Sequence, residues 1–230
     1  MQTDEEMENI QKFGSIPNFE NLTFSVSEKE QPRILIATPA YNGDVTSKYT
    51  ECLIMTCNLL GMNHIEFQVK FINNQIVTRA RNMLAHIFMT GNFTHMLFID
   101  ADISWNPHDV INLLSHDEEC VIGVYPNKAY HFDSSKKNIS LTPSSKILLP
   151  IETKGEYLQR IKHAATGFML LKKAALKRIE KDIDQFYLPN NGQHATSRED
   201  MSLLYNYFNC QVVDNDYLTE DYYFSHLFNK

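Results

Sequence analysis

The chain has 230 residues, of which 43% are hydrophobic and 21% are charged. This composition is typical of a globular protein and excludes a disordered, collagen-like or coiled-coil chain. The formal net charge of −7 argues against a nucleic-acid partner, because binding to a phosphate backbone needs clustered Lys and Arg side chains.

Residues 1–31 are acidic and weakly periodic, and we expect an N-terminal arm with one short helix there. The first residues lack the character of a signal peptide, and no apolar run approaches the roughly 20 residues that span a bilayer. The four cysteines form no CxxC pair and no zinc spacing, which suits a reducing compartment. We therefore expect a cytoplasmic protein without a membrane span, in the host cytoplasm if the chain is viral.

From residue 32 onward, apolar runs alternate with helical patterns. The apolar runs predict strands over 34–37, 65–71, 95–99 and 120–125. The 3.6-residue periodicity between them predicts helices over 45–60, 74–90 and 107–115. Strands that alternate with helices predict right-handed βαβ units, so we expect an α/β fold with a mostly parallel sheet.

The second half of the sequence is less regular. We expect a polar loop over 129–145 and strands near 146–151, 157–162 and 166–171. Helices are expected near 172–183, 198–208 and 219–229. No stretch rich in Gly, Ser or Pro marks a domain boundary, so a single domain over 32–230 follows the arm.

Ligands of an open parallel sheet bind at the carboxyl ends of its strands. Of the three Asp-x-Asp pairs in the chain, only Asp100 and Asp102 directly follow an apolar strand of the βα series. Two carboxylates there can ligate Mg²⁺ or Mn²⁺, which prefer oxygen ligands. The alternative is an ordinary turn before the helix at 107–115.

Glycine-rich phosphate loops are missing, which argues against a P-loop NTPase and a dinucleotide-dependent dehydrogenase. Arg79 and Arg81 lie early in the helix at 74–90, where guanidinium groups suit phosphate oxygens, although a solvated helix face explains them equally well. Lys128, after the fourth strand, is a weaker candidate of the same kind.

Acidic residues recur near the end of the chain. Glu220 and Asp221 open the last helix, where either could be a general base or could complement the helix dipole. His226 follows on that helix as a metal ligand or a structural histidine. Gly167 either permits close approach of a ligand or makes a plain turn, and Trp105 either stacks on a sugar face or packs the helix start.

Six segments of the chain, taken in order, resemble glycosyltransferases of the GT-A fold. The likeness is to the family-2-like and Anp1-like groups, including small viral glycosyltransferase domains. The segments are ILIATPAYNG at 34–43, IVTRARNMLAHIF at 76–88, MLFIDADI at 96–103, VIGVYPNK at 121–128, ATGFMLLKK at 165–173 and LTEDYYFSHLF at 218–228.

The resemblance implies a GT-A type Rossmann-like sandwich, with a mostly parallel central sheet flanked by helices. Residues 32–128 would form the nucleotide-binding half, and residues 129–230 the acceptor-side half. The implied activity is a metal-dependent hexosyltransferase. It would move a sugar from a nucleoside diphosphate sugar, expected to be a UDP-sugar, to a hydroxyl of a glycan or other acceptor.

The resemblance also assigns roles to single residues. The donor and its Mn²⁺ or Mg²⁺ would lie against Thr38, Ala40, Tyr41, Arg79, Arg81, Asp100, Ala101, Asp102 and Lys128. The acceptor side would include Trp105, Gly167 and Phe168. Asp221, or else Glu220, would be the base of an inverting transfer. Either His226 or water would complete the metal ligands, or the chain would be one domain of a longer polypeptide.

Two further functions are consistent with the sequence. A sugar-1-phosphate nucleotidylyltransferase also uses an α/β sheet and Mg²⁺, but the GxGxR-type stretch expected near the first strand is absent. A nucleotide- or glycan-binding module without catalysis would keep the same fold.

Overall fold

The computed structural model describes residues 31–133, 138–147, 153–154, 158–189 and 197–230. The chain divides into two compact units, Met1–Gln31 and Pro32–Lys230, and all the elements below belong to the second unit. The short helix expected within the N-terminal arm lies outside the described residues.

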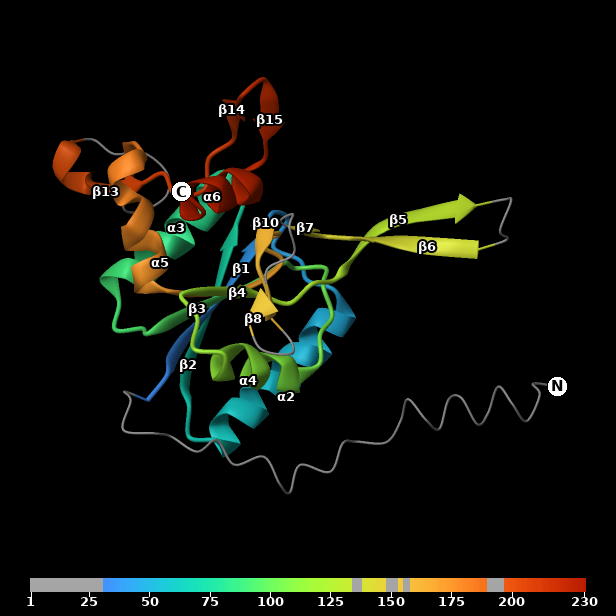
Figure 1. Ribbon diagram of the computed structural model, residues 1–230. Helices are drawn as coiled ribbons and strands as arrows, with labels where there is room; N and C mark the ends of the chain where they lie inside the picture. The colour runs from blue at the N-terminus through green and yellow to red at the C-terminus, as the bar shows by residue number, and fades with distance from the viewer. Residues whose placement is uncertain (1–30, 134–137, 148–152, 155–157, 190–196) are drawn as a thin grey trace. The chain divides into compact units, whose positions relative to one another are not determined.

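The centre of the fold is a five-stranded mixed sheet (Figure 1). In spatial order its strands are β2 (Glu66–Asn73), β1 (Arg33–Ala40), β3 (His95–Ile99), β11 (Phe168–Lys172) and β4 (Cys120–Ile122). β1 pairs in parallel with β2 and β3, whereas β11 is antiparallel to both β3 and β4. Four of the strands therefore run in one direction, and the predicted α/β class is confirmed.

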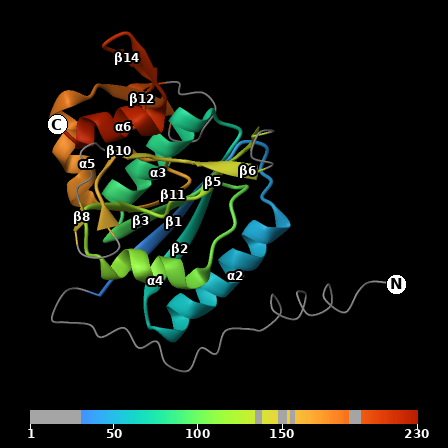
Figure 2. The same cartoon turned by 45° about the vertical axis from the view of Figure 1, so that its right-hand side comes forward.

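Helices cover both faces of this sheet (Figures 1 and 2). One face carries α3 (Val77–Thr90), α5 (Lys173–Ile179) and α6 (Glu220–Phe228), and the other carries α2 (Ser47–Met62) and α4 (Pro107–Ser115). α4 has the predicted bounds, because the Asn106 side chain caps it by accepting from the His108 N–H and Pro107 occupies its first turn. None of the described helices is long and apolar enough to cross a membrane.

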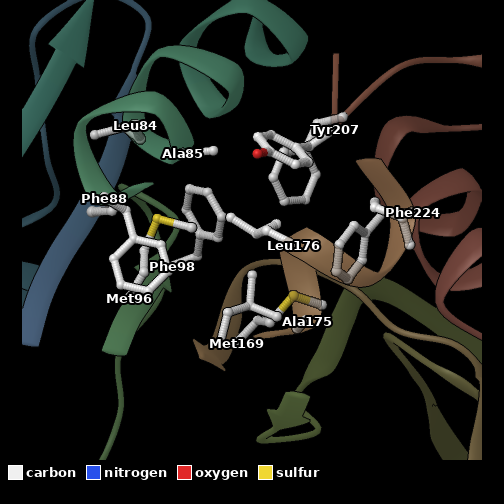
Figure 3. Packing of buried hydrophobic residues seen from close by; sticks show 14 of the residues in the cluster. Leu84, Ala85, Phe88, Met96, Phe98, Met169, Ala175, Leu176, Tyr207 and Phe224 are labelled. Atoms are coloured by element: carbon white, nitrogen blue, oxygen red, sulfur yellow. The ribbon is translucent and has the colours of Figure 1, made fainter. Parts of the chain in front are cut away.

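The main hydrophobic core lies between the sheet and the layer of α3, α5 and α6 (Figure 3). Phe98 of β3 and Phe224 of α6 both pack against Phe208, with ring centroids 5.3 Å and 5.0 Å away. All three rings are buried. Each buried aromatic ring removes a large apolar surface from water, so this stack fixes the position of α6 over the sheet.

The remaining elements are short and lie outside the central sheet. They are β5 (Pro126–Asp133), β6 (Asn138–Pro143), β7 (Lys146–Ile147), β8 (Thr153–Lys154), β9 (Leu158–Gln159), β10 (Ile161–His163), η1 (Glu180–Asp182), β12 (Gln185–Pro189), η2 (Arg198–Asp200), β13 (Met201–Tyr205), β14 (Gln211–Val213) and β15 (Asp216–Leu218). The strands among them form antiparallel pairs: β5 with β6, β7 with β10, β8 with β9, β12 with β13, and β14 with β15.

Two predicted elements are wrong. The loop expected over 129–145 contains the β5–β6 hairpin, which projects from the body of the unit in Figure 1. The helix expected over 198–208 is only one turn, η2, followed by β13. Leu204 of β13 is buried while its neighbour Leu203 is exposed, an alternation typical of a strand.

Asn82 of α3 holds the segment between β13 and β14. Its side-chain oxygen accepts from the Phe208 N–H (2.9 Å), and its amide group donates to the Phe208 carbonyl (3.2 Å) and to the Asn206 side chain (2.8 Å). Asn82 is 1% exposed, so its loss leaves buried backbone groups without partners. These bonds anchor Phe208 where it meets α6.

Replacing this anchor should destabilise the fold. We expect Asn82→Ala to lower the free energy of unfolding by about 2 kcal/mol, because buried polar groups lose their hydrogen bonds. Urea unfolding followed by circular dichroism measures the change. The exposed Asn112→Ala on α4 is the control, expected within about 0.5 kcal/mol of the parent. Equal stability of Asn82→Ala and the control would contradict the anchoring role.

Candidate functional site

The carboxyl ends of β1, β2 and β3 meet at one edge of the sheet, and backbone hydrogen bonds join the loops that follow them. The Asn74 N–H donates to the Tyr41 carbonyl (2.8 Å), and the Thr46 N–H donates to the Ala101 carbonyl (3.0 Å). The Asp100 N–H donates to the Gly167 carbonyl (3.0 Å), which ties the end of β3 to the start of β11. The edge is therefore a connected platform, as expected for a binding edge of an α/β sheet.

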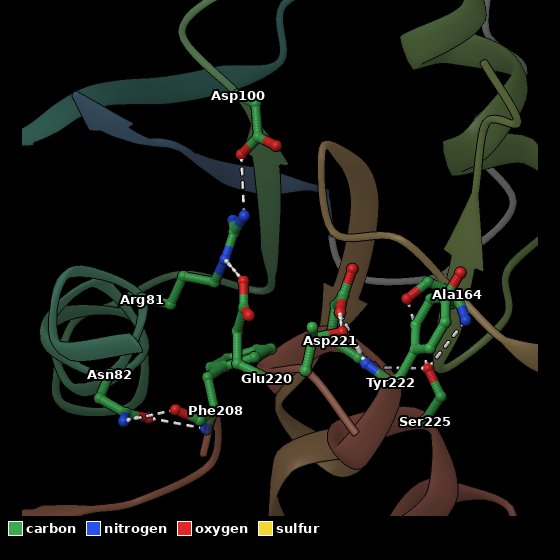
Figure 4. A network of polar contacts seen from close by, with 10 residues as sticks. Arg81, Asn82, Asp100, Ala164, Phe208, Glu220, Asp221, Tyr222 and Ser225 are labelled. Carbon is green, nitrogen blue, oxygen red and sulfur yellow. Dashed lines mark hydrogen bonds and ion pairs between the residues drawn. The ribbon is translucent and has the colours of Figure 1, made fainter. Parts of the chain in front are cut away.

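Arg81 of α3 is the centre of this edge (Figure 4). Its Nη2 donates to Asp100 Oδ1 at 3.0 Å, and its Nε donates to Glu220 Oε1 at 3.3 Å. The Arg81 side chain is 4% exposed, against 12% for Glu220 and 30% for Asp100. One buried cation thus joins the strand that carries Asp100 to the first turn of α6.

The charge of Arg81 is maintained by its surroundings. Burial alone would lower the Arg81 pKa, but the carboxylates of Asp100, Glu220 and Asp221 raise it above its usual value. The guanidinium also lies over the Phe98 ring, 5.5 Å from the ring centroid. Its Nη1 is buried, and this one nitrogen of the cation lacks a hydrogen-bond partner in the described chain.

The two acids of α6 have different environments. Glu220 is buried and paired with Arg81. Asp221 is partly exposed, and its Oδ1 accepts from the Thr219 hydroxyl and from the Tyr222 N–H. These bonds orient the Asp221 carboxylate and leave its Oδ2 without a hydrogen bond to the described residues. Of the two, Asp221 is the better placed to accept a proton.

Tyr125 closes the site beside Gly167. Burial first, and then the nearby Asp100 carboxylate, raise the pKa of Tyr125 to about 12, so the phenol remains protonated at neutral pH. A Cβ on Gly167 would lie 2.1 Å from the Tyr125 hydroxyl and 2.6 Å from Ile103 Cδ1. Only glycine fits there, because Tyr125 and Ile103 approach so closely. The close approach of a ligand to Gly167 stays a prediction.

Asp100 and Asp102 are the candidate metal ligands. Asp100 keeps Oδ2 clear of hydrogen bonds within the described chain, and Asp102 is exposed on the turn after β3. The described residues contain no group of three or more His, Cys, Asp and Glu side chains that could hold a metal ion. Mg²⁺ typically binds one or two carboxylates and completes its ligands with water and substrate phosphates. This pair therefore suits Mg²⁺, and does not suit an ion whose ligands must all come from the protein.

His226 is not brought to the two aspartates. It lies near the end of α6 and lines a different pocket, with Lys162 and Lys230. Burial first and then the Lys230 charge lower its pKa. The expectation that His226 is a third metal ligand is therefore corrected: the side chain is on the far part of the helix from Glu220.

Three other expected ligand contacts are also corrected. Thr38 is fully buried and its hydroxyl is hydrogen-bonded to the Tyr49 hydroxyl, so it cannot line a nucleoside pocket. Trp105 packs edge-on against Tyr49 at 5.2 Å, and its Nε1–H donates to Thr56 (2.8 Å). Phe168 is buried and packs against Trp105. These side chains stabilise the contact of α2 with the sheet and do not face a ligand.

The remaining candidates lie at or near the edge. Ala40 is buried at the end of β1, while the following Tyr41 is 68% exposed. Arg79 lies in the first turn of α3, with its Nε buried and without a partner in the described chain. Lys128 belongs to β5, and its side chain lies outside the described part of the structure.

Two residues important to this site were not predicted as site residues. Tyr125 ends the fourth apolar run and was identified only as part of a strand end, and Asn82 was not considered. A polar residue one position from Arg81 on the core side of a helix is a usable signal, because buried amides are nearly always hydrogen-bonded.

One pocket of the described residues lies elsewhere, away from the carboxyl edge. It measures about 580 Å³ and is lined at the amino end of β1 by Arg33, Phe67 and Phe93, among others. The charged side chains that converge at the carboxyl edge are absent from its lining. Because those charged side chains converge at the carboxyl edge and not in this pocket, the carboxyl edge is the better candidate for the functional site.

Comparison with known proteins gives little guidance. No protein-family model matches the chain, and no curated protein matches it. Among solved structures, the chain is similar to one described as the crystal structure of A197 from STIV, with 18% sequence identity and a TM-score of 0.37. That match covers 65% of this chain and 69% of the other, and a likeness this slight carries no argument about function.

The contact of Tyr125 with Gly167 predicts the cost of adding one methyl group at the edge. We expect Gly167→Ala to lower the free energy of unfolding by about 2 kcal/mol, because the new Cβ overlaps the phenol and the backbone must shift. Adding Tyr125→Phe removes the overlapping oxygen and should restore part of the loss. Chemical denaturation of the three proteins measures both effects.

Gly61→Ala in α2 is the matched control, because a Cβ there meets nothing within 4 Å. It should raise stability by about 0.5 to 1 kcal/mol through the better helix propensity of alanine. If Gly167→Ala were as stable as Gly61→Ala, the close approach of Tyr125 would be refuted.

Proposed function

We propose that the protein is a glycosyltransferase that moves a sugar from a nucleoside diphosphate sugar, expected to be a UDP-sugar, to an acceptor hydroxyl. The single observation that carries the proposal is the buried Arg81, which joins Asp100 at the end of β3 to Glu220 at the start of α6. Two segments that resemble glycosyltransferase motifs in sequence are thus neighbours in space.

The sheet supports the same proposal. Its order, with an antiparallel β11 inserted between the parallel strands β3 and β4, is compatible with a GT-A type sheet. The aspartate pair follows the central strand β3 at the carboxyl edge, where α/β sheets bind their ligands.

Asp100 and Asp102 would hold a Mg²⁺ or Mn²⁺ ion, which when bound would neutralise the charge of the leaving diphosphate. Arg81 adds a fixed positive charge next to Asp100, which would favour the negative charge of a diphosphate nearby. Arg79, in the first turn of α3, would add a second positive charge near this edge. Arg81 is held by its two ion pairs before a ligand arrives, which lowers the cost of binding.

Asp221 is the proposed general base. Its Oδ1 is fixed by the Thr219 hydroxyl and the Tyr222 N–H, so Oδ2 is the oxygen that would take the proton from the acceptor hydroxyl. Glu220 is instead a positioning residue, since its carboxylate is bound to Arg81. Gly167 and Tyr125 form the neighbouring wall, where little space is left for water.

A second candidate is a nucleotide-binding module that does not catalyse transfer. The pairing of Asp100 with Arg81 favours it, because the arginine already offsets one of the two negative charges that would attract a metal ion. Such a module would bind a nucleotide without needing Mn²⁺.

The proposal is tested by a thermal-shift screen with UDP-, GDP-, CMP- and dTDP-sugars, each with and without Mn²⁺. We expect one donor, a UDP-sugar, to raise the melting temperature only with Mn²⁺, because a ligand stabilises the state that binds it. The same donor should be hydrolysed or transferred slowly, which a coupled assay for released UDP detects. Asp102→Asn should lose both responses and keep its melting temperature without ligand.

Asp182→Asn is the matched control, because Asp182 belongs to another Asp-x-Asp pair and is exposed on η1. It should respond to the donor as the parent does. Equal responses of the parent and Asp102→Asn would refute the metal assignment. Stabilisation without Mn²⁺ and without turnover would support the binding module instead.

A further inference from the structure

A second polar pocket lies on the other part of α6, away from Glu220. It has a volume of about 280 Å³ and lies between β10 and the last turn of the helix, which packs over β10 in Figure 2. Its lining consists of Arg160, Lys162, His163, His226, Asn229 and Lys230. The side chains of this lining include three cationic groups and two histidines, and none of them is acidic.

The walls of this pocket are tied together. The Asn229 amide group donates to the backbone carbonyls of Ile161 and Lys162, both at 3.2 Å. One turn earlier, the Ser225 hydroxyl accepts from the Ala164 N–H at 2.9 Å. These bonds fix α6 to β10 and to the residue that follows it, so the pocket is formed before any ligand binds.

His163 forms a fixed part of the wall of this pocket. Its ring stacks on Tyr222 at 4.6 Å, the residue is 7% exposed, and its Nδ1 is buried without a hydrogen-bond partner in the described chain. Leaving such an atom unpaired costs about 1 to 3 kcal/mol, and native structures usually match it with water or a ligand. This atom is closed off from the pocket, so a ligand there would contact the exposed side chains of Lys162 and Lys230.

The electrostatics of the two histidines agree with an anionic ligand. Burial first, and then the charges of Lys162 and Lys146, lower the pKa of His163, while burial and then Lys230 lower that of His226. Asp221 near His163 and Asp214 near His226 act in the opposite direction without reversing the shift. An anion in the pocket would offset the lysine charges and raise both pKa values.

We propose that this pocket binds the phosphate group of a small, soluble phosphate monoester. Lys162 and Lys230 line this pocket beside the two imidazoles, and a phosphate dianion is attracted to such cationic side chains more strongly than a singly charged carboxylate. The small volume suits a phosphate with a short organic group. This inference stands apart from the proposed sugar transfer, since it uses none of the residues at the carboxyl edge.

The test follows the ring signals of His163 and His226 by NMR during titration with inorganic phosphate and with glycerol 3-phosphate, at ionic strength held constant with NaCl. We expect a saturable change in both rings and a rise in both pKa values. Lys162→Gln should weaken binding about tenfold, the factor expected for loss of one charged hydrogen bond. Lys70→Gln on β2, the far edge strand of the sheet, is the matched control and should bind as the parent does.

Lys230→Gln is a second variant in case Lys162→Gln does not fold, as judged by its melting temperature. A linear, unsaturated response, or equal weakening by Lys70→Gln, would overturn the proposal in favour of general ionic attraction. Binding to vesicles that contain phosphatidic acid with no response to the soluble phosphates would overturn it in favour of a membrane surface.

Discussion

The structure depends on one buried guanidinium. Arg81 is almost fully buried, and a buried charge is tolerated only when partners of opposite charge compensate for its lost hydration. Its two partners, Asp100 and Glu220, come from a sheet strand end and from the last helix. The requirement to keep this cation paired therefore fixes the distance between the carboxyl edge of the sheet and α6.

The rest of the packing serves the same geometry. Asn82, the neighbour of Arg81 on α3, binds the backbone of Phe208, and the Phe208 ring packs between Phe98 and Phe224. The hydrogen bonds hold the chain that leads to α6, and the aromatic contacts hold α6 itself. On the opposite face of the sheet, the ring of Trp105 packs against Tyr49 of α2 and holds this helix in place. A rigid scaffold of this kind supports precise placement of Asp221 relative to the aspartate pair.

Local sequence signals predicted the first half of the fold well. The strand at 95–99 and the helix at 107–115 appear with the expected bounds, since apolar periodicity and an Asn-Pro cap act over a few residues. Prediction failed where structure depends on distant partners. The helix expected over 198–208 contains the strand β13 instead, because pairing with β12 decides the conformation there.

The site shows the same division. The strand-end rule located Asp100, and helix position located Arg81. The ion pair of Arg81 with Glu220, however, joins residues 139 positions apart and leaves no local signal. The resemblance to glycosyltransferases implied that Thr38 would face the donor, yet its hydroxyl is hydrogen-bonded to the Tyr49 hydroxyl inside the fold. Tertiary contacts decide whether a polar side chain faces solvent or is hydrogen-bonded inside the fold. Sequence periodicity does not reveal these contacts.

The most direct test of the central role of Arg81 is a double-mutant cycle with Arg81→Met and Glu220→Gln, read as free energies of unfolding in urea. Arg81→Met alone should cost about 3 to 5 kcal/mol, because it strands two carboxylates near each other. Adding Glu220→Gln should recover part of that loss, giving a coupling energy of about 1 to 3 kcal/mol. Additive effects, within about 0.5 kcal/mol, would contradict the account, because they would mean that Arg81 and Glu220 do not stabilise each other.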